Sequence, residues 1–187
     1  MAHGAKVRDA RLQDAGRILE IYAHYVKNTA VTFECGVPAP ANFRARMERT
    51  MARYPYLVAE EGDTVQGFAY AGPLSARKAY DWSCETTVYL HPDARGRGWG
   101  RRLYEELGER LREMGVTNLY ACVARPESPD EYLDERSLGF HAHMGFERVG
   151  EFHACGHKFG RWYNVVWMEK VIGRHVECQP PVAFPEA

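Results

Sequence analysis

Apolar residues recur along the chain with two periods, one typical of half-buried strands and one typical of helices. Leu103, Leu107, Leu111 and Met114 fall at spacings of three and four, so they share one helix face. In its first half the pattern predicts a strand over 6–11, a helix led by Asp14 with apolar residues at 18, 19, 22 and 26, a helix over 41–53 that ends before Pro55, a hairpin of 56–60 and 65–71, and a strand over 82–90. In its second half it predicts a loop and helix over 98–114, a strand over 119–123, a helix over 135–144, and strands over 147–157 and 165–170.

Strands and helices mixed along the chain, without an internal repeat, predict one α/β domain over residues 6–172. The last segment, 173–187, contains three prolines and is expected to be a poorly ordered tail. A chain of 187 residues is long enough to bury a core in a single domain.

Charge and hydropathy exclude several classes of protein. With 24 basic and 25 acidic residues, the net charge of −1 provides no overall attraction for nucleic acid or an anionic membrane. The first residues lack the apolar core of a signal peptide, and no stretch approaches the roughly eighteen apolar residues of a membrane span. We expect a cytoplasmic protein without a nucleic-acid or membrane partner.

The cysteine pattern predicts reduced thiols. The five cysteines are odd in number and widely spaced, without a Cys-x-x-Cys pair, which argues against a disulfide framework or a zinc site. Cys84 and Cys122 lie in apolar runs and are expected in the core.

The segment from 85 to 102 predicts a ligand that carries a phosphate. A β-branched strand is followed by a turn and by a loop of arginines and glycines that opens into a helix. The glycines let backbone N–H groups converge, and the helix N-terminus adds about half a positive charge. A dinucleotide fingerprint does not fit, because its third glycine position is Arg101. The spacing that does fit is Arg95-x-x-Gly98-x-Gly100.

This spacing resembles the (Gln/Arg)-x-x-Gly-x-(Gly/Ala) loop of the GCN5-related N-acetyltransferase (GNAT) superfamily, which binds the pyrophosphate of acetyl-coenzyme A. Ordered stretches within about residues 6–170 look like its phosphinothricin N-acetyltransferase branch: 54–60, 69–73, 77–82, 85–89, 137–146 and 156–163. The resemblance implies a mixed, mostly antiparallel sheet flanked by helices, acetyl-coenzyme A as co-substrate, a small-molecule amine as acceptor, and a homodimer. The residues expected at the cofactor are Val88, Tyr89, Leu90, Arg95, Gly96, Arg97, Gly98, Trp99, Gly100, Arg101 and Ser137.

Glu85 is the first candidate for a catalytic residue. Aliphatic ammonium groups titrate near pH 10.4, so an acceptor amine must lose a proton before it attacks. Glu85 is the only carboxylate of its strand, and burial among Tyr80, Trp82 and Tyr89 would raise its pKa toward the range useful for a general base. The alternatives are that Glu85 pairs with Arg77, or orients the ammonium without moving its proton. By resemblance it matches the family's catalytic glutamate.

His141 is the second candidate. It matches the histidine of the family's Ser-x-x-x-His-x-x-x-Gly-Phe/Tyr segment, and Ser137 lies on the same helix face. Its two alternative roles are to relay protons and to form part of the pocket wall.

Three residues are candidates for binding the acceptor. Arg77 follows the break at Pro73 and is expected at the mouth of the cleft beside Tyr80 and Glu85, where a guanidinium and a carboxylate would hold a zwitterionic amino acid. Resemblance to phosphinothricin and methionine-sulfone acetyltransferases implies the same kind of acceptor. Phe33 would wall this pocket or belong to the core. A polyamine or a protein N-terminus is the alternative acceptor.

The chain departs from the family's pattern at two places. Asp134, in a longer acidic segment over 125–136, stands where the branch carries a Pro-Asn that organises the cofactor end of the site. Ser75 stands where relatives often carry a lysine.

Two rival functions come from other protein classes. His153, Cys155 and His157 alternate on one strand, with His141 and His143 nearby in sequence, as in a metal-binding module, although no acidic partner is near and we expect no metal. An arginine-rich binder of single-stranded nucleic acid would use Arg95, Arg97, Arg101 and Arg102.

Overall fold

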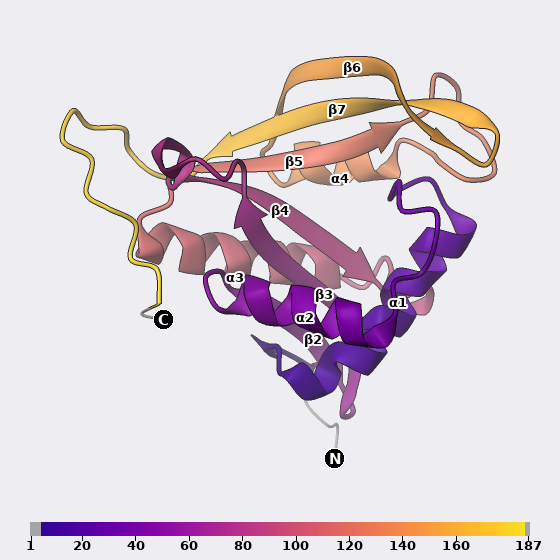
Figure 1. Ribbon diagram of the computed structural model, residues 1–187, viewed down its shortest axis with the longest axis horizontal. Coiled ribbons are helices and arrows are strands. Elements are labelled where there is room, and N and C mark those ends of the chain that lie inside the picture. The colour runs from indigo at the N-terminus through magenta and orange to yellow at the C-terminus, as the bar shows by residue number, and fades with distance from the viewer. Residues whose placement is uncertain (1–4, 186–187) are drawn as a thin grey trace.

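A computed structural model describes residues 5–185 as one mixed α/β unit (Figure 1). The elements are β1 (Lys6–Asp9), α1 (Ala15–Asn28), α2 (Pro40–Met51), β2 (Tyr56–Glu61), β3 (Thr64–Pro73), β4 (Ser83–Leu90), α3 (Trp99–Met114), β5 (Asn118–Arg125), α4 (Arg136–His143), β6 (Glu147–Lys158) and β7 (Arg161–Val171). Every predicted element is present, and β7 begins four residues before the predicted strand. The early start places Tyr163 opposite Gly156 of β6, where its side chain is buried.

The strands form a seven-stranded sheet in the order β1-β2-β3-β4-β5-β7-β6. All neighbours are antiparallel except β4 and β5, which confirms the predicted mixed, mostly antiparallel sheet. The parallel pair is short, since only Ser83–Glu85 pair with residues 118–120. Beyond Glu85 the two strands diverge, as Figure 1 shows, and the backbone edge of β4 is left without a neighbouring strand.

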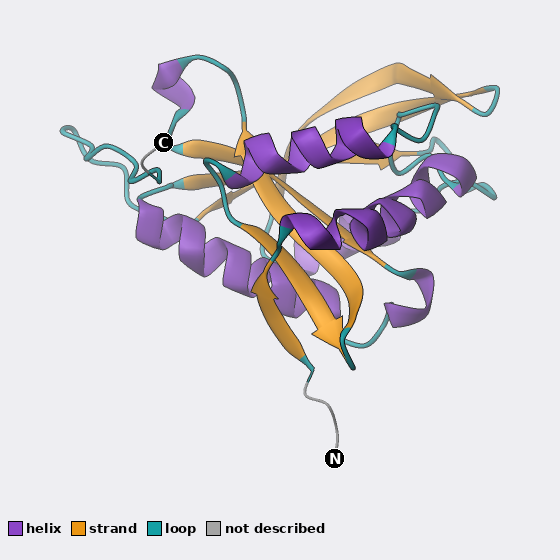
Figure 2. Ribbon diagram, turned by 60° about the horizontal axis from the view of Figure 1, so that its bottom comes forward, coloured by secondary structure: helices purple, strands orange, loops and turns teal. Residues whose placement is uncertain are grey.

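Helices cover both faces of the sheet (Figure 2). Strand alternation in β2 turns Tyr56 and Val58 toward α1 and α2, whereas Leu57 and Ala59 pack in the core that contains α3. The apolar face of α3 is fully buried in that second core, and α4 adds partly buried residues to it. The sheet is therefore rigidly supported on both sides of the point where β4 and β5 separate.

The segment after β7 differs from the poorly ordered tail expected from its prolines. Residues 173–185 form no helix or strand, yet Val182 is buried and the guanidinium of Arg53 lies 3.9 Å from the Phe184 ring. The indole Nε1–H of Trp82 donates to the Pro180 carbonyl at 2.7 Å. Two apolar side chains and one hydrogen bond thus hold this segment on the core. Residues 186–187 lie outside the described residues.

None of the helices within residues 5–185 combines the length and the apolar character needed to cross a membrane.

Candidate functional site

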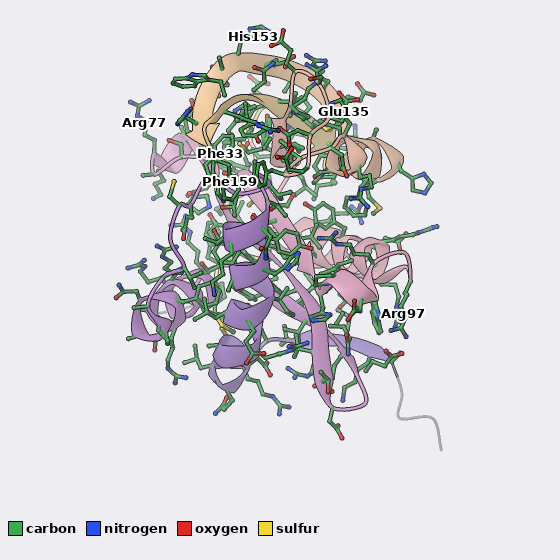
Figure 3. The ribbon with its side chains drawn as sticks, turned by 90° about the vertical axis from the view of Figure 1, so that its right-hand side faces the viewer. Phe33, Arg77, Arg97, Glu135, His153 and Phe159 are labelled. Carbon is green, nitrogen blue, oxygen red and sulfur yellow. The ribbon has the colours of Figure 1, made fainter. Side chains whose placement is uncertain are left out.

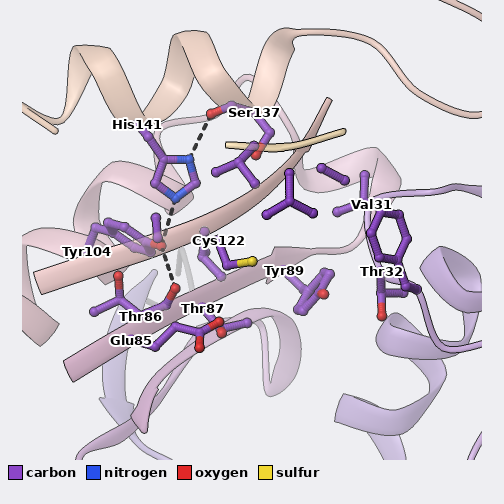
Figure 4. Close-up of a pocket in the computed structure, with 16 residues that line it drawn as sticks. Val31, Thr32, Glu85, Thr86, Thr87, Tyr89, Tyr104, Cys122, Ser137 and His141 are labelled. Carbon is purple, nitrogen blue, oxygen red and sulfur yellow. Dashed lines mark hydrogen bonds between the residues drawn. The ribbon is translucent and has the colours of Figure 1, made fainter. Parts of the chain in front are cut away.

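Two adjoining cavities open where β4 and β5 separate. The larger has a volume of about 910 Å³ and lies between the end of β4, the start of α3, α1 and the 130–134 segment. The smaller, of about 190 Å³, lies between β4, β5, α4 and the loop after α1 (Figure 4). Val31, Val88, Tyr89 and Ser137 line both, so a ligand in one cavity can reach a ligand in the other.

The end of the larger cavity at the 95–100 loop is suited to an anionic ligand. Gly96 and Gly100 lie in its wall, and Arg95 lies there with its guanidinium 5.2 Å from the Tyr25 ring. Gly96 and Gly98 have φ values of 72° and 80°, in the left-handed region that glycine adopts at low cost. Within residues 5–185 no backbone carbonyl accepts a hydrogen bond from the N–H of Gly96 or Gly98. These N–H groups and the N-terminus of α3 can therefore bind phosphate oxygens.

Three of the predicted cofactor residues have side chains that lie outside this cavity. Arg97 forms an ion pair with Glu61 of the β2–β3 hairpin at 2.6 Å, far from Phe33 in Figure 3. Trp99 is buried in the core. Arg101 pairs with Glu105 one helical turn further along at 2.7 Å.

Several other cofactor predictions fall in the cavity wall. Leu90, Ser137 and the residues shared by both cavities line it, and Gly98 is the N-cap of α3. Tyr25, which the sequence did not suggest, donates its hydroxyl to the Leu90 carbonyl at 2.6 Å and so holds the end of β4 against α1.

The free edge of β4 directs backbone N–H groups at the gap. The N–H of His91 donates to the Gln66 carbonyl on the β3 side at 2.7 Å. Because pairing alternates along an antiparallel ladder, the N–H groups of Leu90 and Val88 point the opposite way, toward the side that β5 has left. The backbone nitrogen of Leu90 lies 3.4 Å from the Tyr25 hydroxyl oxygen. Val88 lines both cavities, so its N–H faces the place where they meet.

Glu85 lies in the wall of the smaller cavity, on β4 just where β5 departs. Burial raises the pKa of its carboxyl group, and no cation within residues 5–185 offsets this effect. Of the predicted neighbours, Tyr89 lines the same cavity as Glu85 and Tyr80 lines neither cavity. Desolvation, helped by the charge of Glu85, raises the pKa of Tyr70 and of Tyr104. A desolvated carboxylate without an ion pair is suited to accept a proton.

His141 is 6% exposed and has both ring nitrogens engaged (Figure 4). Its Nδ1 lies 2.8 Å from the Ser137 carbonyl oxygen, which can only accept, so Nδ1 carries the hydrogen. Its Nε2 lies 3.0 Å from the Tyr104 hydroxyl and accepts from it, and that hydroxyl is also 3.3 Å from the Thr86 carbonyl. Burial lowers the pKa of His141 and raises that of Tyr104, so both groups are neutral near pH 7.

The predicted acceptor residues are only partly brought together. Phe33 lines the smaller cavity with Glu85 and also packs on a small core cluster that contains Tyr163, so each of its two interpretations describes part of its surroundings. Arg77 and Tyr80 are exposed and line neither cavity, and Arg77 forms no ion pair with Glu85 within the described chain. Arg77 precedes a 3₁₀ turn, Lys78–Tyr80, that carries it to the periphery of the molecule (Figure 3).

Residues that sequence reasoning missed complete the two walls. Cys84 is in the core as expected, but Cys122 is not: it lines the smaller cavity, and desolvation raises the pKa of its thiol to about 11. The 130–134 segment lines the larger cavity. Asp134 accepts from the N–H of Arg136 at 2.9 Å, so its carboxylate caps the start of α4.

The rival functions find little support in the geometry. Within residues 5–185, His, Cys, Asp and Glu side chains form no group of three that could hold a metal ion. The four arginines of the loop do not form one basic surface, because Arg97 and Arg101 are paired with carboxylates and Arg102 lies 4.7 Å over the Trp99 ring.

Comparison with known proteins agrees with this geometry. Residues 7–167 match the model of the acetyltransferase (GNAT) domain. The chain is 38% identical to a phosphinothricin N-acetyltransferase of Alcaligenes faecalis, and the match covers 89% of this chain and 82% of the relative. It is 35% identical to an L-methionine sulfoximine/L-methionine sulfone acetyltransferase of Pseudomonas aeruginosa, and that match covers 88% of this chain and 93% of the relative. A phosphinothricin acetyltransferase of Sinorhizobium meliloti, solved with acetyl-coenzyme A, superimposes with a TM-score of 0.85 at 33% identity, covering 95% of this chain and 93% of that one.

The chain therefore belongs to the GNAT acetyltransferase family. The predicted family, fold, acyltransferase activity and use of acetyl-coenzyme A are confirmed by the matching domain and by relatives that extend over nearly the whole chain.

Proposed function

We propose that this enzyme transfers the acetyl group of acetyl-coenzyme A directly to the amine of a small amino-acid-like acceptor, such as phosphinothricin, methionine sulfone or methionine sulfoximine. The observation that carries the proposal is Glu85: an unpaired, desolvated carboxylate in a small cavity that adjoins the cavity suited to a phosphate-bearing ligand. The names of the similar proteins support the same class of acceptor. We assign the catalytic domain to residues 6–172.

In this proposal the larger cavity holds acetyl-coenzyme A. The pyrophosphate meets the N–H groups around Gly96, Gly98 and Gly100 and the charge of Arg95, while the pantetheine arm follows the free edge of β4 past Leu90. This course brings the thioester to the junction of the two cavities.

The acetyl transfer then needs one base and one hydrogen-bond donor. The acceptor enters the smaller cavity as an ammonium ion, and Glu85 takes one of its protons. The amine nitrogen attacks the thioester carbonyl carbon, and the N–H of Val88 stabilises the resulting oxyanion. The nitrogen loses its second proton to solvent, the C–S bond breaks, and coenzyme A leaves as a thiolate that solvent or a nearby hydroxyl protonates. His141 and Tyr104 form the wall behind this reaction, because their polar atoms are already hydrogen bonded to each other.

Release of free coenzyme A thiol, measured across a panel of amino acids and analogues, tests this function. We expect turnover with methionine sulfone and phosphinothricin, the acceptor class that the names of the similar proteins support, and little with polyamines or peptides. The reverse preference would contradict the acceptor class and leave the acetyltransferase assignment in place. Arg77 and Tyr80 remain acceptor contacts predicted from the sequence.

We also propose that the enzyme is a homodimer. Four large apolar side chains, Val149, Phe152, Phe159 and Trp162, are exposed on β6 and β7 or the turn between them, at one edge of the sheet. A second copy of the chain would cover them, as the resemblance implies. Sedimentation velocity should show a dimer that Trp162→Glu converts to a monomer. A cytoplasmic location stays a prediction, supported by five unpaired cysteines that a reducing compartment keeps as thiols.

A further inference from the structure

Lys158, at the end of β6, is a buried cation that the mechanism does not use. It is 4% exposed, and its Nζ donates to the Thr32 carbonyl at 2.7 Å and lies 5.0 Å from the Phe159 ring centroid. Within the described chain no carboxylate lies within 4.0 Å of this ammonium. Burial of a charge without an ion pair is costly, and it lowers the pKa of Lys158, while the charges of Cys35 and Glu34 act in the opposite direction. The bond to Thr32 is the only hydrogen bond that the described residues offer this ammonium.

Gly156, two residues earlier on the same strand, makes a second contact with the same loop. A Cβ atom placed on Gly156 would lie 2.1 Å from Cε2 and 2.4 Å from Cζ of Phe33, far inside the roughly 3.5 Å of carbon–carbon contact. The φ angle of Gly156 is not in the left-handed region, so the backbone does not require glycine here. The absence of a side chain is what lets the Phe33 ring lie directly on β6.

The two contacts hold neighbouring residues of one wall of the smaller cavity. Val31, Thr32 and Phe33 all line that cavity with Glu85, and Figure 4 shows Val31 and Thr32 across the cavity from Glu85 and His141. This stretch belongs to no helix or strand, so contacts from outside it decide where it lies. Lys158 holds its backbone, and Gly156 provides the space for its aromatic ring.

We infer that Lys158 and Gly156 are positioning residues that set the place of the Thr32–Phe33 wall, and through it the affinity of the enzyme for its acceptor. The inference rests on the proposed function, which places the acceptor in this cavity. Neither residue lines the cavity itself, so both act through the loop.

The first test compares Lys158→Met with Lys158→Arg, using coenzyme A release with methionine sulfone as the probe. Lys158→Met should raise the acceptor KM at least about tenfold, with kcat and the KM for acetyl-coenzyme A within about twofold of wild type. Lys158→Arg keeps a cationic donor and should recover part of the loss. Lys170→Met is the matched control, because Lys170 also donates to a backbone carbonyl, that of Met144 at 2.7 Å, but far from the loop. It should leave the acceptor KM unchanged.

The second test is a double-mutant cycle between Gly156 and Phe33. Gly156→Ala should raise the acceptor KM by displacing the ring, and the same change should have little further effect in a Phe33→Ala background, where no ring is displaced. Gly150→Ala is the control on the same strand, since a Cβ there meets nothing within 4 Å. If the effects of Gly156→Ala and Phe33→Ala were additive, the contact would not position the wall.

Hydrogen exchange of the amides of residues 31–35 separates the inference from the proposed function. We expect faster exchange there in Lys158→Met and unchanged exchange in α3. If the wild type acetylated no amino acid while exchange rose as expected, the proposed acceptor would be wrong and the positioning role would stand. If the wild type were active and Lys158→Met changed neither acceptor KM nor exchange, the inference would be overturned.

Discussion

Replacing Glu85 with glutamine removes the proposed base and almost nothing else. The side chains have the same shape, and the Glu85 carboxylate receives no hydrogen bond or ion pair that shifts its pKa within residues 5–185, so no partner is orphaned. General-base catalysis contributes about a hundredfold or more, which at 1.36 kcal/mol per tenfold is about 2.7 kcal/mol of activation free energy. If Glu85 only oriented the ammonium, the glutamine oxygen would still accept its hydrogen bond, and the loss would stay below about tenfold.

The pH dependence of the same variant gives an independent check. Burial raises the pKa of Glu85, so wild-type kcat/KM should rise with pH through that shifted value, and Glu85→Gln should lose this limb. A carboxyl group whose folded pKa is raised contributes stability that is fully present below its unfolded pKa and is lost as pH rises through the folded pKa. At neutral pH the charged Glu85 therefore costs stability, and Glu85→Gln should unfold at no lower a temperature than wild type.

The assay is steady-state release of coenzyme A thiol from pH 5.5 to 9, with calorimetric titration of acetyl-coenzyme A and thermal unfolding on the same samples. Glu106→Gln, an isosteric change on α3 outside both cavities, is the control. Near-normal turnover of Glu85→Gln at every pH would refute the assignment of the base. A large loss of acetyl-coenzyme A affinity would show that Glu85 acts on the cofactor instead.

Three further predictions follow from the site and its support. Gly96→Ala and Gly62→Ala both place a Cβ at a left-handed glycine where nothing lies within 4 Å, so each should lower the free energy of unfolding by about 1–2 kcal/mol. Only Gly96→Ala should raise the Kd for acetyl-coenzyme A in calorimetry, and equal Kd values for the two variants would contradict the loop assignment. His141→Ala should lower kcat less than about tenfold, since neither ring nitrogen is free to act as a base, and a larger loss than that of Glu85→Gln would reverse the two roles. Trp82→Phe loses the bond to Pro180 and should reduce stability by about 1 kcal/mol, which lowers Tm by roughly 2–4 °C; an unchanged Tm would show that the bond does not hold the 173–185 segment.

Much of the fold and the position of Glu85 in the cavity wall could be predicted because they depend on backbone pattern. The apolar spacing of α3 and the glycines before it predict a strand, a loop and a helix, and this prediction does not depend on the contacts that the arginine side chains of the loop make. Glu85 lies on β4, the predicted strand, and lines the smaller cavity. The family motif adds the order of the sheet, which no local pattern contains.

The rest depended on contacts between distant segments. The resemblance places Arg97 at the cofactor, but the carboxylate of Glu61, from the β2–β3 hairpin, holds its side chain outside the cavity. Cys122 lies in an apolar run, yet it faces the gap that exists only because β4 and β5 diverge. Three prolines predict a poorly ordered C-terminal segment, whereas the Phe184 ring packs against the Tyr54 ring and the Arg53 guanidinium.

The most direct test of the proposed activity is a competition in one vessel. Purified enzyme and limiting acetyl-coenzyme A are incubated with equal concentrations of methionine sulfone, phosphinothricin, spermidine and a short peptide with a free N-terminus, and the acetylated products are measured by mass spectrometry. We predict that N-acetylated amino-acid analogues dominate and that they fall about a hundredfold in Glu85→Gln. Acetylation mainly of spermidine or the peptide, or product formation that does not depend on Glu85, would contradict the account.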